Sequence, residues 1–213
     1  MKMEQNNKII YTIGYSAHTI ESFITALEKF NITAIADVRS QPYSKFKPEF
    51  NKENLKKVLI NNGIEYVFLG DNIGARIKAP ECYKNGQVDY ELISQHPLFQ
   101  AGIDRLLKGM EKYSIALMCA EKDPINCHRT ILICKHLKRY QIQIYHVLDA
   151  NTFENHSETE IRLMKLFNLE QPDLFIKDSE RLAEAYSRQE EKIAYVAENE
   201  AAYKVNHTGF DSE

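Results

Sequence analysis

The sequence contains no run of 18 apolar residues, and this absence excludes a transmembrane helix. It also shows no internal repeat and no low-complexity segment. Residues 1–8 are polar and lack the apolar core of a secretory signal, so we expect a cytoplasmic protein. With 213 residues, of which 44% are hydrophobic, the chain can bury the core of one domain with additions, or of two small domains.

The chain has only four cysteines, and they are unevenly spaced, which favours free thiols in a reduced protein. A zinc site would have to combine Cys119, Cys127 and His128, with Cys82 as a fourth ligand. The C-x7-C-H spacing matches no common zinc motif, and adjacent Cys and His residues rarely ligate one ion. We therefore expect no metal and no cofactor.

The net charge of −3 divides unevenly along the chain. Residues 1–150 carry 20 Lys and Arg against 16 Asp and Glu, whereas residues 151–213 carry 7 against 14. A basic body with an acidic tail suits a protein that binds an anion on its body, although the same asymmetry also serves solubility. We expect an anionic small molecule or a nucleic-acid component as partner and no membrane, with a homodimer as an open alternative.

Apolar runs and helical periodicities alternate along the body of the chain. Such alternation indicates parallel strands joined by right-handed crossovers, and uninterrupted apolar strands are typical of a sheet covered on both faces. The sequence therefore predicts an α/β fold: an open, mostly parallel sheet of about five strands flanked by helices. The expected strands are 8–13, 34–38, 64–69, 115–120 and 143–148.

Capping residues mark several helix ends. Thr19 is placed to cap a helix over residues 20–30, Asn51 precedes a second helix, and Gly63 is placed to end it. A further helix is expected over Arg129–Tyr140.

Residues 151–213 are predicted to form a helical C-terminal extension packed on an α/β domain of residues 1–150. Residues 156–167 have a helical pattern, and Ser179–Tyr203 reads as one long charged helix. Its thin apolar stripe is expected to dock on the body. The stripe consists of Leu182, Ala185, Tyr186, Ile193 and Val196.

Polar residues collect where the expected strands end, and open parallel sheets bind ligands at the carboxyl ends of their strands. Ordinary solvated loops are the alternative, but four such loops, three of them with an arginine, favour an anion-binding or phosphate-binding cleft. The segments are Gly14-Tyr-Ser-Ala-His18, Asp37-Val-Arg-Ser40, Gly70-Asp-Asn-Ile-Gly-Ala-Arg76 and Cys119–Arg129.

The segment from Cys119 to Arg129 is a polar turn between an apolar strand and a helix. Arg129 in the first helical turn opposes the helix dipole, and a bound anion would remove that conflict and accept bidentate hydrogen bonds. The alternative is a salt bridge from Arg129 to a nearby carboxylate. Cys127 could be a nucleophile of low pKa, with Cys119 as the cysteine that resolves its oxidised form. The alternative is that both are small buried residues.

The loop from Arg39 to Asn51 alternates basic and aromatic side chains, a combination that suits a phosphate with a stacked base. The alternative is that Phe46 and Phe50 anchor the loop from below, and we prefer this for Phe50. For Tyr43 and the lysines of this loop, both roles remain open.

Asp37 is expected inside the cleft, where it could act as a general base or orient an arginine. His18 and His128 are further acid–base candidates. The candidate catalytic residues are Asp37, Cys119, Glu121, Cys127 and His128, and the candidate substrate-binding residues are Gly14, Ser16, Arg39, Tyr43, Arg76, Lys122 and Arg129.

These motifs together resemble the family described as domain of unknown function 488. The resemblance rests above all on Cys119-Ala-Glu-Lys-Asp-Pro-x-x-Cys-His-Arg129, and also on Thr12-Ile-Gly-Tyr-Ser16 and Asp37-Val-Arg-Ser40. It extends roughly over residues 9–196, and it implies an α/β domain in a bacterial cytoplasm but no particular reaction. Tyr15 stands where many members have His, so a catalytic His is not available there.

Three hypotheses follow for the function. The first is an enzyme, a hydrolase or transferase, that acts on a phosphate-bearing nucleotide or nucleic-acid component. The second is a non-catalytic nucleic-acid-binding module that uses the basic and aromatic stretch from Arg39 to Lys57. The third is a cysteine-based redox or sulfur-handling protein.

Overall fold

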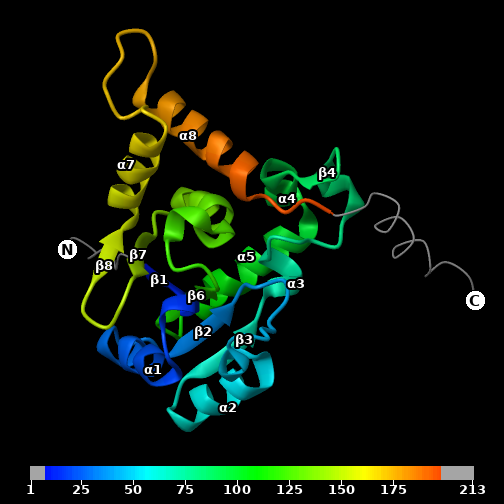
Figure 1. Ribbon diagram of the computed structural model, residues 1–213, viewed down its shortest axis with the longest axis vertical. Coiled ribbons are helices and arrows are strands. Elements are labelled where there is room, and N and C mark those ends of the chain that lie inside the picture. The colour runs from blue at the N-terminus through cyan, green and yellow to red at the C-terminus, as the bar shows by residue number, and fades with distance from the viewer. Residues whose placement is uncertain (1–7, 198–213) are drawn as a thin grey trace, which may run out of the picture.

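The computed structural model describes residues 8–197 (Figure 1). A six-stranded sheet in the order β3-β2-β6-β1-β7-β8 runs through it, and all strand pairs are parallel except β7 with β8. The strands are β1 (Ile9–Gly14), β2 (Ala34–Asp37), β3 (Glu65–Phe68), β6 (Ile115–Cys119), β7 (Gln143–Val147) and β8 (Phe153–Asn155).

The α/β prediction is confirmed, and each of the five expected strands is present to within one residue at either end. Strands β2 and β6 are buried along their whole length at the centre of the sheet, which explains their uninterrupted apolar sequences. The sixth strand, β8, is three residues long and partly exposed, so it has no apolar pattern by which the sequence could reveal it.

Helices cover both faces of the sheet (Figure 1). One face packs on α1 (Ile20–Lys29) and α2 (Lys52–Asn61) through residues such as Phe23 and Leu59. The other packs on α5 (Pro97–Gly109) and the helical segment after β6. Shorter helices are α3 (Gly70–Ile73) and α4 (Tyr90–Gln95), and a hairpin of β4 (Tyr83–Lys84) and β5 (Gln87–Val88) lies between them.

The expected helix over Arg129–Tyr140 has mixed hydrogen bonding. It begins as a π-helical turn over Arg129–Cys134, continues as α6 (Lys135–Leu137) and ends as a 3₁₀ turn over Lys138–Tyr140. π-helical turns often occur at functional sites, and this one begins where the polar turn after β6 ends.

The C-terminal extension contains α7 (His156–Leu166) and α8 (Asp178–Ile193). Ala185 and Tyr186 of the expected stripe are buried in the same hydrophobic cluster as α5. The long helix was expected to run to Tyr203, but α8 ends at Ile193, and residues 198–203 lie outside the described part. Val196 lies beyond the helix and is 56% exposed, so it does not belong to the docking stripe.

After α8 the chain forms a short strap, residues 194–197, across the β4–β5 hairpin. Val88 donates its amide to the carbonyl of Tyr195, and Ala197 donates to the carbonyl of Gly86. No helix in residues 8–197 is long and apolar enough to cross a membrane.

Candidate active site

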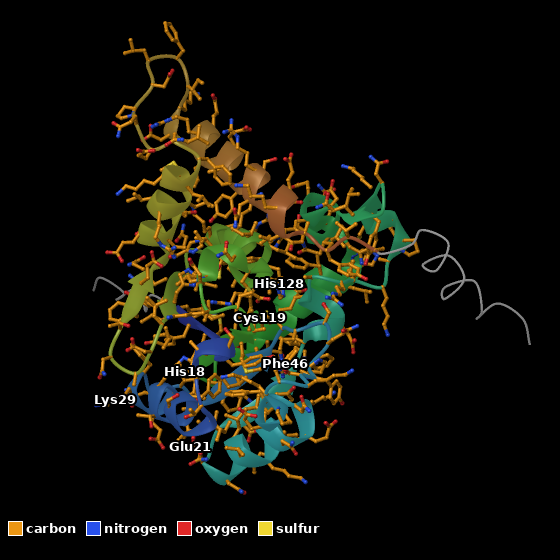
Figure 2. The ribbon with its side chains drawn as sticks, viewed as in Figure 1. His18, Glu21, Lys29, Phe46, Cys119 and His128 are labelled. Atoms are coloured by element: carbon orange, nitrogen blue, oxygen red, sulfur yellow. The ribbon has the colours of Figure 1, made fainter. Side chains whose placement is uncertain are left out.

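A pocket of about 370 Å³ opens at the carboxyl edge of the sheet. Its walls come from the loop after β2, from the segment after α3 and from the end of α8 with the strap. We call residues 120–128, which follow β6, the site loop. The pocket is also lined by Cys119 of β6 and by Glu121 and His128 of the site loop. Cys119 and His128 lie side by side near the middle of the molecule (Figure 2). The expected cleft at this edge therefore exists as a cavity.

Two thiols and an imidazole converge at the base of this pocket. The Nδ1 atom of His128 lies 3.7 Å from the Sγ of Cys119 and 3.8 Å from the Sγ of Cys127. The Nε2 atom of His128 lies 3.0 Å from the carbonyl oxygen of Val38, and because a carbonyl only accepts, this nitrogen carries the proton. The Nδ1 atom is therefore the ring nitrogen that faces the two sulfurs. The Cys119 thiol also donates to Glu121 Oε2 over 3.1 Å.

The two thiols differ in acidity. The hydrogen bond that Cys119 shares with Cys127, together with burial, raises the pKa of the Cys119 thiol well above its ordinary value. Burial alone would do the same to Cys127, but the hydrogen bond from Cys119 and the charge of Arg129 lower the pKa of the Cys127 thiol well below it. Cys127 is therefore the more acidic thiol of the pair.

Arg129 is completely enclosed, with 1% of its surface exposed, and it does not line the pocket. Its Nη1 donates to the carbonyl of Glu121 over 2.7 Å, its Nη2 to the carbonyl of Lys122 and its Nε to the hydroxyl of Thr12. Arg129 was expected to contact an anion in the pocket, or else to form a salt bridge with a carboxylate. Among the described residues it does neither. Arg129 instead fixes the backbone of the site loop.

Gly14 also serves the site loop. A Cβ atom at this position would lie 1.8 Å from the carbonyl oxygen of Glu121, so only glycine allows β1 and the loop to approach this closely. The amide of Ser16 donates to the carbonyl of Ala120 over 2.9 Å, and Ser16 does not line the pocket. Lys122 is exposed, and its contact here is through its backbone carbonyl. Gly14, Ser16 and Lys122, which were expected to contact substrate, are not part of the pocket lining, and their observed contacts are with the site loop.

Asp37 is fully buried behind the pocket wall. Its carboxylate accepts from Nε of Arg39 at 2.9 Å, from Nη2 of Arg39 at 2.6 Å and from the hydroxyl of Tyr66 at 2.7 Å. A carboxylate engaged in this way cannot reach a substrate, so the general-base role is corrected and the orienting role is what the geometry supports. Arg39 is presented to the pocket with its Nη1 buried and without a hydrogen-bond partner among residues 8–197.

Arg76 lines the opposite side of the pocket. Its guanidinium lies over the ring of Tyr195, 4.2 Å from the centroid, and its amide donates to the hydroxyl of Ser40 over 2.8 Å. Within the described chain no carboxylate forms a salt bridge with Arg76. Stacking holds the charge in place while its hydrogen-bond donors remain available.

The family model for "Domain of unknown function DUF488" matches residues 19–135 of the chain. The protein belongs to this family. The matched region contains both arginines of the pocket and the whole site loop. No curated protein and no solved structure matches the chain.

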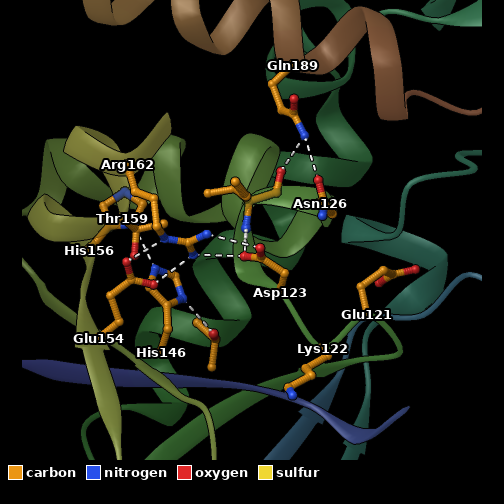
Figure 3. Close-up of polar contacts among 12 residues, drawn as sticks. Glu121, Lys122, Asp123, Asn126, His146, Glu154, His156, Thr159, Arg162 and Gln189 are labelled. Carbon is orange, nitrogen blue, oxygen red and sulfur yellow. Dashed lines mark hydrogen bonds and ion pairs between the residues drawn. The ribbon is translucent and has the colours of Figure 1, made fainter. Parts of the chain in front are cut away.

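In this DUF488 member the extension beyond the matched region grips the site loop from two sides (Figure 3). Arg162 of α7 bridges Asp123 and Glu154 with four hydrogen bonds of 2.8–3.0 Å. Gln189 of α8 donates to the carbonyl of Ile125 and to Oδ1 of Asn126. The loop that carries the reactive groups is therefore fixed by Arg129 from the sheet and by the extension from outside.

The candidate residues that line the DUF488 pocket come from three loops far apart in the sequence. Cys127 lies directly behind this lining, and His18 is buried against Phe23, away from it. The expected residues that do line the pocket are Arg39, Tyr43, Arg76, Cys119, Glu121 and His128.

Several residues of the pocket wall were not among the candidates from sequence, and four of them carry polar side chains from different elements. Tyr90 begins α4, Tyr195 lies in the strap, Tyr15 follows β1, and Asn126 lies in the site loop. The chain has 12 tyrosines, so residue type alone did not mark these particular tyrosines as pocket residues. Tyr15, in the motif that follows β1, and Asn126, in the segment from Cys119 to Arg129, stood where the sequence could have pointed to them.

Proposed function

We propose that the protein is an enzyme that acts on a small anionic substrate, of which a phosphate-bearing compound is the favoured class. The observation that carries this proposal is the meeting of two kinds of group in one pocket. Arg39 and Arg76 offer unused hydrogen-bond donors, and a thiol, a carboxylate and an imidazole lie beside them. Such a combination of a binding charge with acid–base and nucleophilic groups is typical of an active site.

The arginines suit a planar, multiply charged oxyanion. Arg39 lines the pocket, is oriented by Asp37 through two hydrogen bonds and is 5% exposed, and its Nη1 has no hydrogen-bond partner among residues 8–197. Arg76 is held by stacking on Tyr195. Guanidinium groups that are oriented in advance bind phosphate or carboxylate with little further loss of side-chain entropy.

Arg76→Ala tests the proposal with little risk to the fold, because Arg76 is exposed. We expect binding of a stabilising nucleotide or phosphosugar, found by thermal shift, to weaken by about 1.5–3 kcal/mol, roughly 10-fold to 150-fold. Isothermal titration calorimetry measures the loss. Arg105→Ala, an exposed arginine of α5 outside the pocket, is the matched control and should leave affinity unchanged. Equal affinity of the two variants, or no phosphate-bearing ligand for the wild type, contradicts the proposal.

One observation favours a nucleic-acid-binding module as second candidate. Phe46 is 97% exposed beside Lys45, close to the pocket residues Tyr43 and Ser44. An exposed ring and a lysine are what a stacked base and its phosphate require. This candidate predicts that Phe46→Ala weakens binding of single-stranded oligonucleotides and that affinity falls steeply with salt. Phe50 is fully buried and serves as the loop anchor.

A further inference from the structure

We propose that Cys119, Cys127 and His128 bind a zinc-like divalent cation at the base of the pocket. Their ligand atoms, two Sγ and one Nδ1, lie within 4.8 Å of one another. This inference deepens the proposed function, since the ion would lie at the same pocket, but binding of the ion can be measured without any substrate.

The distances suit tetrahedral coordination. With Zn–S near 2.3 Å and Zn–N near 2.0–2.1 Å, a tetrahedral ion separates sulfur from nitrogen by about 3.5 Å. The observed separations between sulfur and Nδ1 are 3.7 and 3.8 Å. Small side-chain rotations therefore suffice to bring all three ligands to bonding distance.

The imidazole is oriented as in a metal ligand. Because Nε2 donates to the carbonyl of Val38, the ring is held with Nδ1, the nitrogen left to bind an ion, turned toward both sulfurs. A metal-binding histidine almost always donates its other ring N–H to a carboxylate, a backbone carbonyl or a water, and Val38 supplies such a carbonyl here.

A phenol without a partner provides an independent observation. Tyr90 is 3% exposed and lines the pocket, and its hydroxyl has no hydrogen-bond partner in the described part of the chain. Tyr90 lines the same pocket as Cys119, Glu121 and His128. A buried hydroxyl normally has a partner, and a water or ligand atom on the ion would supply it.

The charges of the region also favour a cation. Two thiolates and Glu121 would repel one another, whereas Arg129 supplies one positive charge. With a divalent ion added, the formal charges of the ion, both thiolates, Glu121 and Arg129 cancel.

The backbone between Cys127 and His128 allows both neighbours to face one ion, which the spacing in the sequence does not indicate. Cys127 is extended, with φ −135° and ψ 138°, whereas His128 is helical, with φ −57° and ψ −26°. This change of direction turns both side chains toward Cys119. Cys82, the fourth ligand considered from sequence, is not part of the cluster.

Three protein ligands leave the fourth position for water or substrate, the arrangement of catalytic zinc sites. Glu121 lines the pocket next to Cys119, so it is placed to accept a proton from a water at that position. The ion would lower the pKa of that water to about 7. The chemistry implied for the pocket is therefore hydrolytic.

The test uses the full-length protein, reduced and stripped with a chelator, then titrated with Co²⁺ and Zn²⁺. We expect one ion per chain, with the sulfur-to-cobalt charge-transfer absorption that thiolate ligation produces. Cys119→Ser, Cys127→Ser and His128→Gln should each lose more affinity than the roughly 10–100-fold that loss of an outer-shell partner costs. Cys82→Ser and Cys134→Ser, which also alter buried thiols, are the matched controls and should bind like the wild type.

If a variant fails to fold, the charge-transfer absorption of the wild type alone shows whether the metal site exists. Three results would overturn the metal site. They are absence of the charge-transfer band, equal losses of affinity in the control variants, and formation of a Cys119–Cys127 disulfide, seen as a mass loss of two hydrogens, as the only change. Arg76→Ala should keep the ion while it loses the anion. Loss of one kind of binding without the other therefore separates failure of the metal site from failure of the proposed function.

Discussion

Arg129 shows how a single residue can support a site without touching a ligand. It is buried among β1 and the site loop, and three of its nitrogens donate to two carbonyl oxygens and a hydroxyl. Its positive charge also stabilises the Cys127 thiolate. The same side chain therefore fixes the loop backbone and sets the electrostatics of the neighbouring sulfur.

We expect Arg129→Ala to lower the free energy of unfolding by at least about 3 kcal/mol, because buried acceptors that lose a donor cost about 1–3 kcal/mol each. Urea denaturation followed by circular dichroism measures the change. Arg139→Ala, at an exposed position of the same helical segment, should stay within about 0.5 kcal/mol of the wild type. A variant of Arg129 as stable as that of Arg139 would show that the buried contacts contribute nothing.

At the scale of elements, α8 does more than cover the sheet. Its buried face carries Ala185 and Tyr186 into the core, and one turn later Gln189 reaches the site loop. Below it, Thr12, His146, His156 and Tyr186 form a buried chain of hydrogen bonds from β1 to α8. The extension is thus tied to the site through both apolar and polar contacts.

Gln189→Ala should loosen the site loop while it leaves the core intact. Two hydrogen bonds to Ile125 and Asn126 are lost, so we expect faster hydrogen exchange of amides in residues 121–128 and a global loss of only about 1–2 kcal/mol. Exchange measured by mass spectrometry locates the effect. Arg188→Ala, the exposed neighbour paired with Glu184, is the control, and equal exchange in both variants counts against a grip by α8.

At the scale of the whole molecule, buried histidines set a limit on acid stability. Burial lowers the pKa of His136 to about 4 and that of His156 to about 4, from ordinary values near 6.5. The unfolded chain therefore binds protons between pH 6.5 and pH 4 that the folded chain does not. The contribution of these two histidines to the free energy of unfolding is fully present above pH 6.5. It is lost as the pH falls toward 4, by at most about 1.4 kcal/mol per pH unit for each proton.

His136→Leu should flatten this dependence. Both ring nitrogens of His136 lack hydrogen-bond partners within residues 8–197, and the ring packs edge-on against Phe99, so an apolar residue fits there. We expect the free energy of unfolding of the variant to fall less than that of the wild type between pH 6.5 and pH 5. Lys135→Ala, the exposed neighbour, controls for substitution in this helix. Parallel curves for wild type and His136→Leu would exclude this histidine as a source of the acid sensitivity.

Local signals in the sequence predicted local structure well. Thr19 forms the capping box of α1, and Gly63 adopts a left-handed conformation, with φ +71°, just after α2. Asn51 does precede α2, but its side chain accepts from the amide of Ser44 and forms no cap. A cap depends on the nearest few residues and can be recognised from them, whereas the choice of Asn51 between two neighbouring amides depends on where the loop folds back.

The sequence by itself determined the parallel sheet, because apolar runs of the right length must be buried on both faces, and it determined that polar loops would meet at the carboxyl edge. Only the tertiary structure decided what each polar residue does there. Arg129 and Arg39 are both arginines at strand or helix ends, yet one is sealed among backbone carbonyls and the other faces the pocket. That difference, like the meeting of Cys119 with Cys127 and His128, depends on the direction of side chains across elements that only packing brings together.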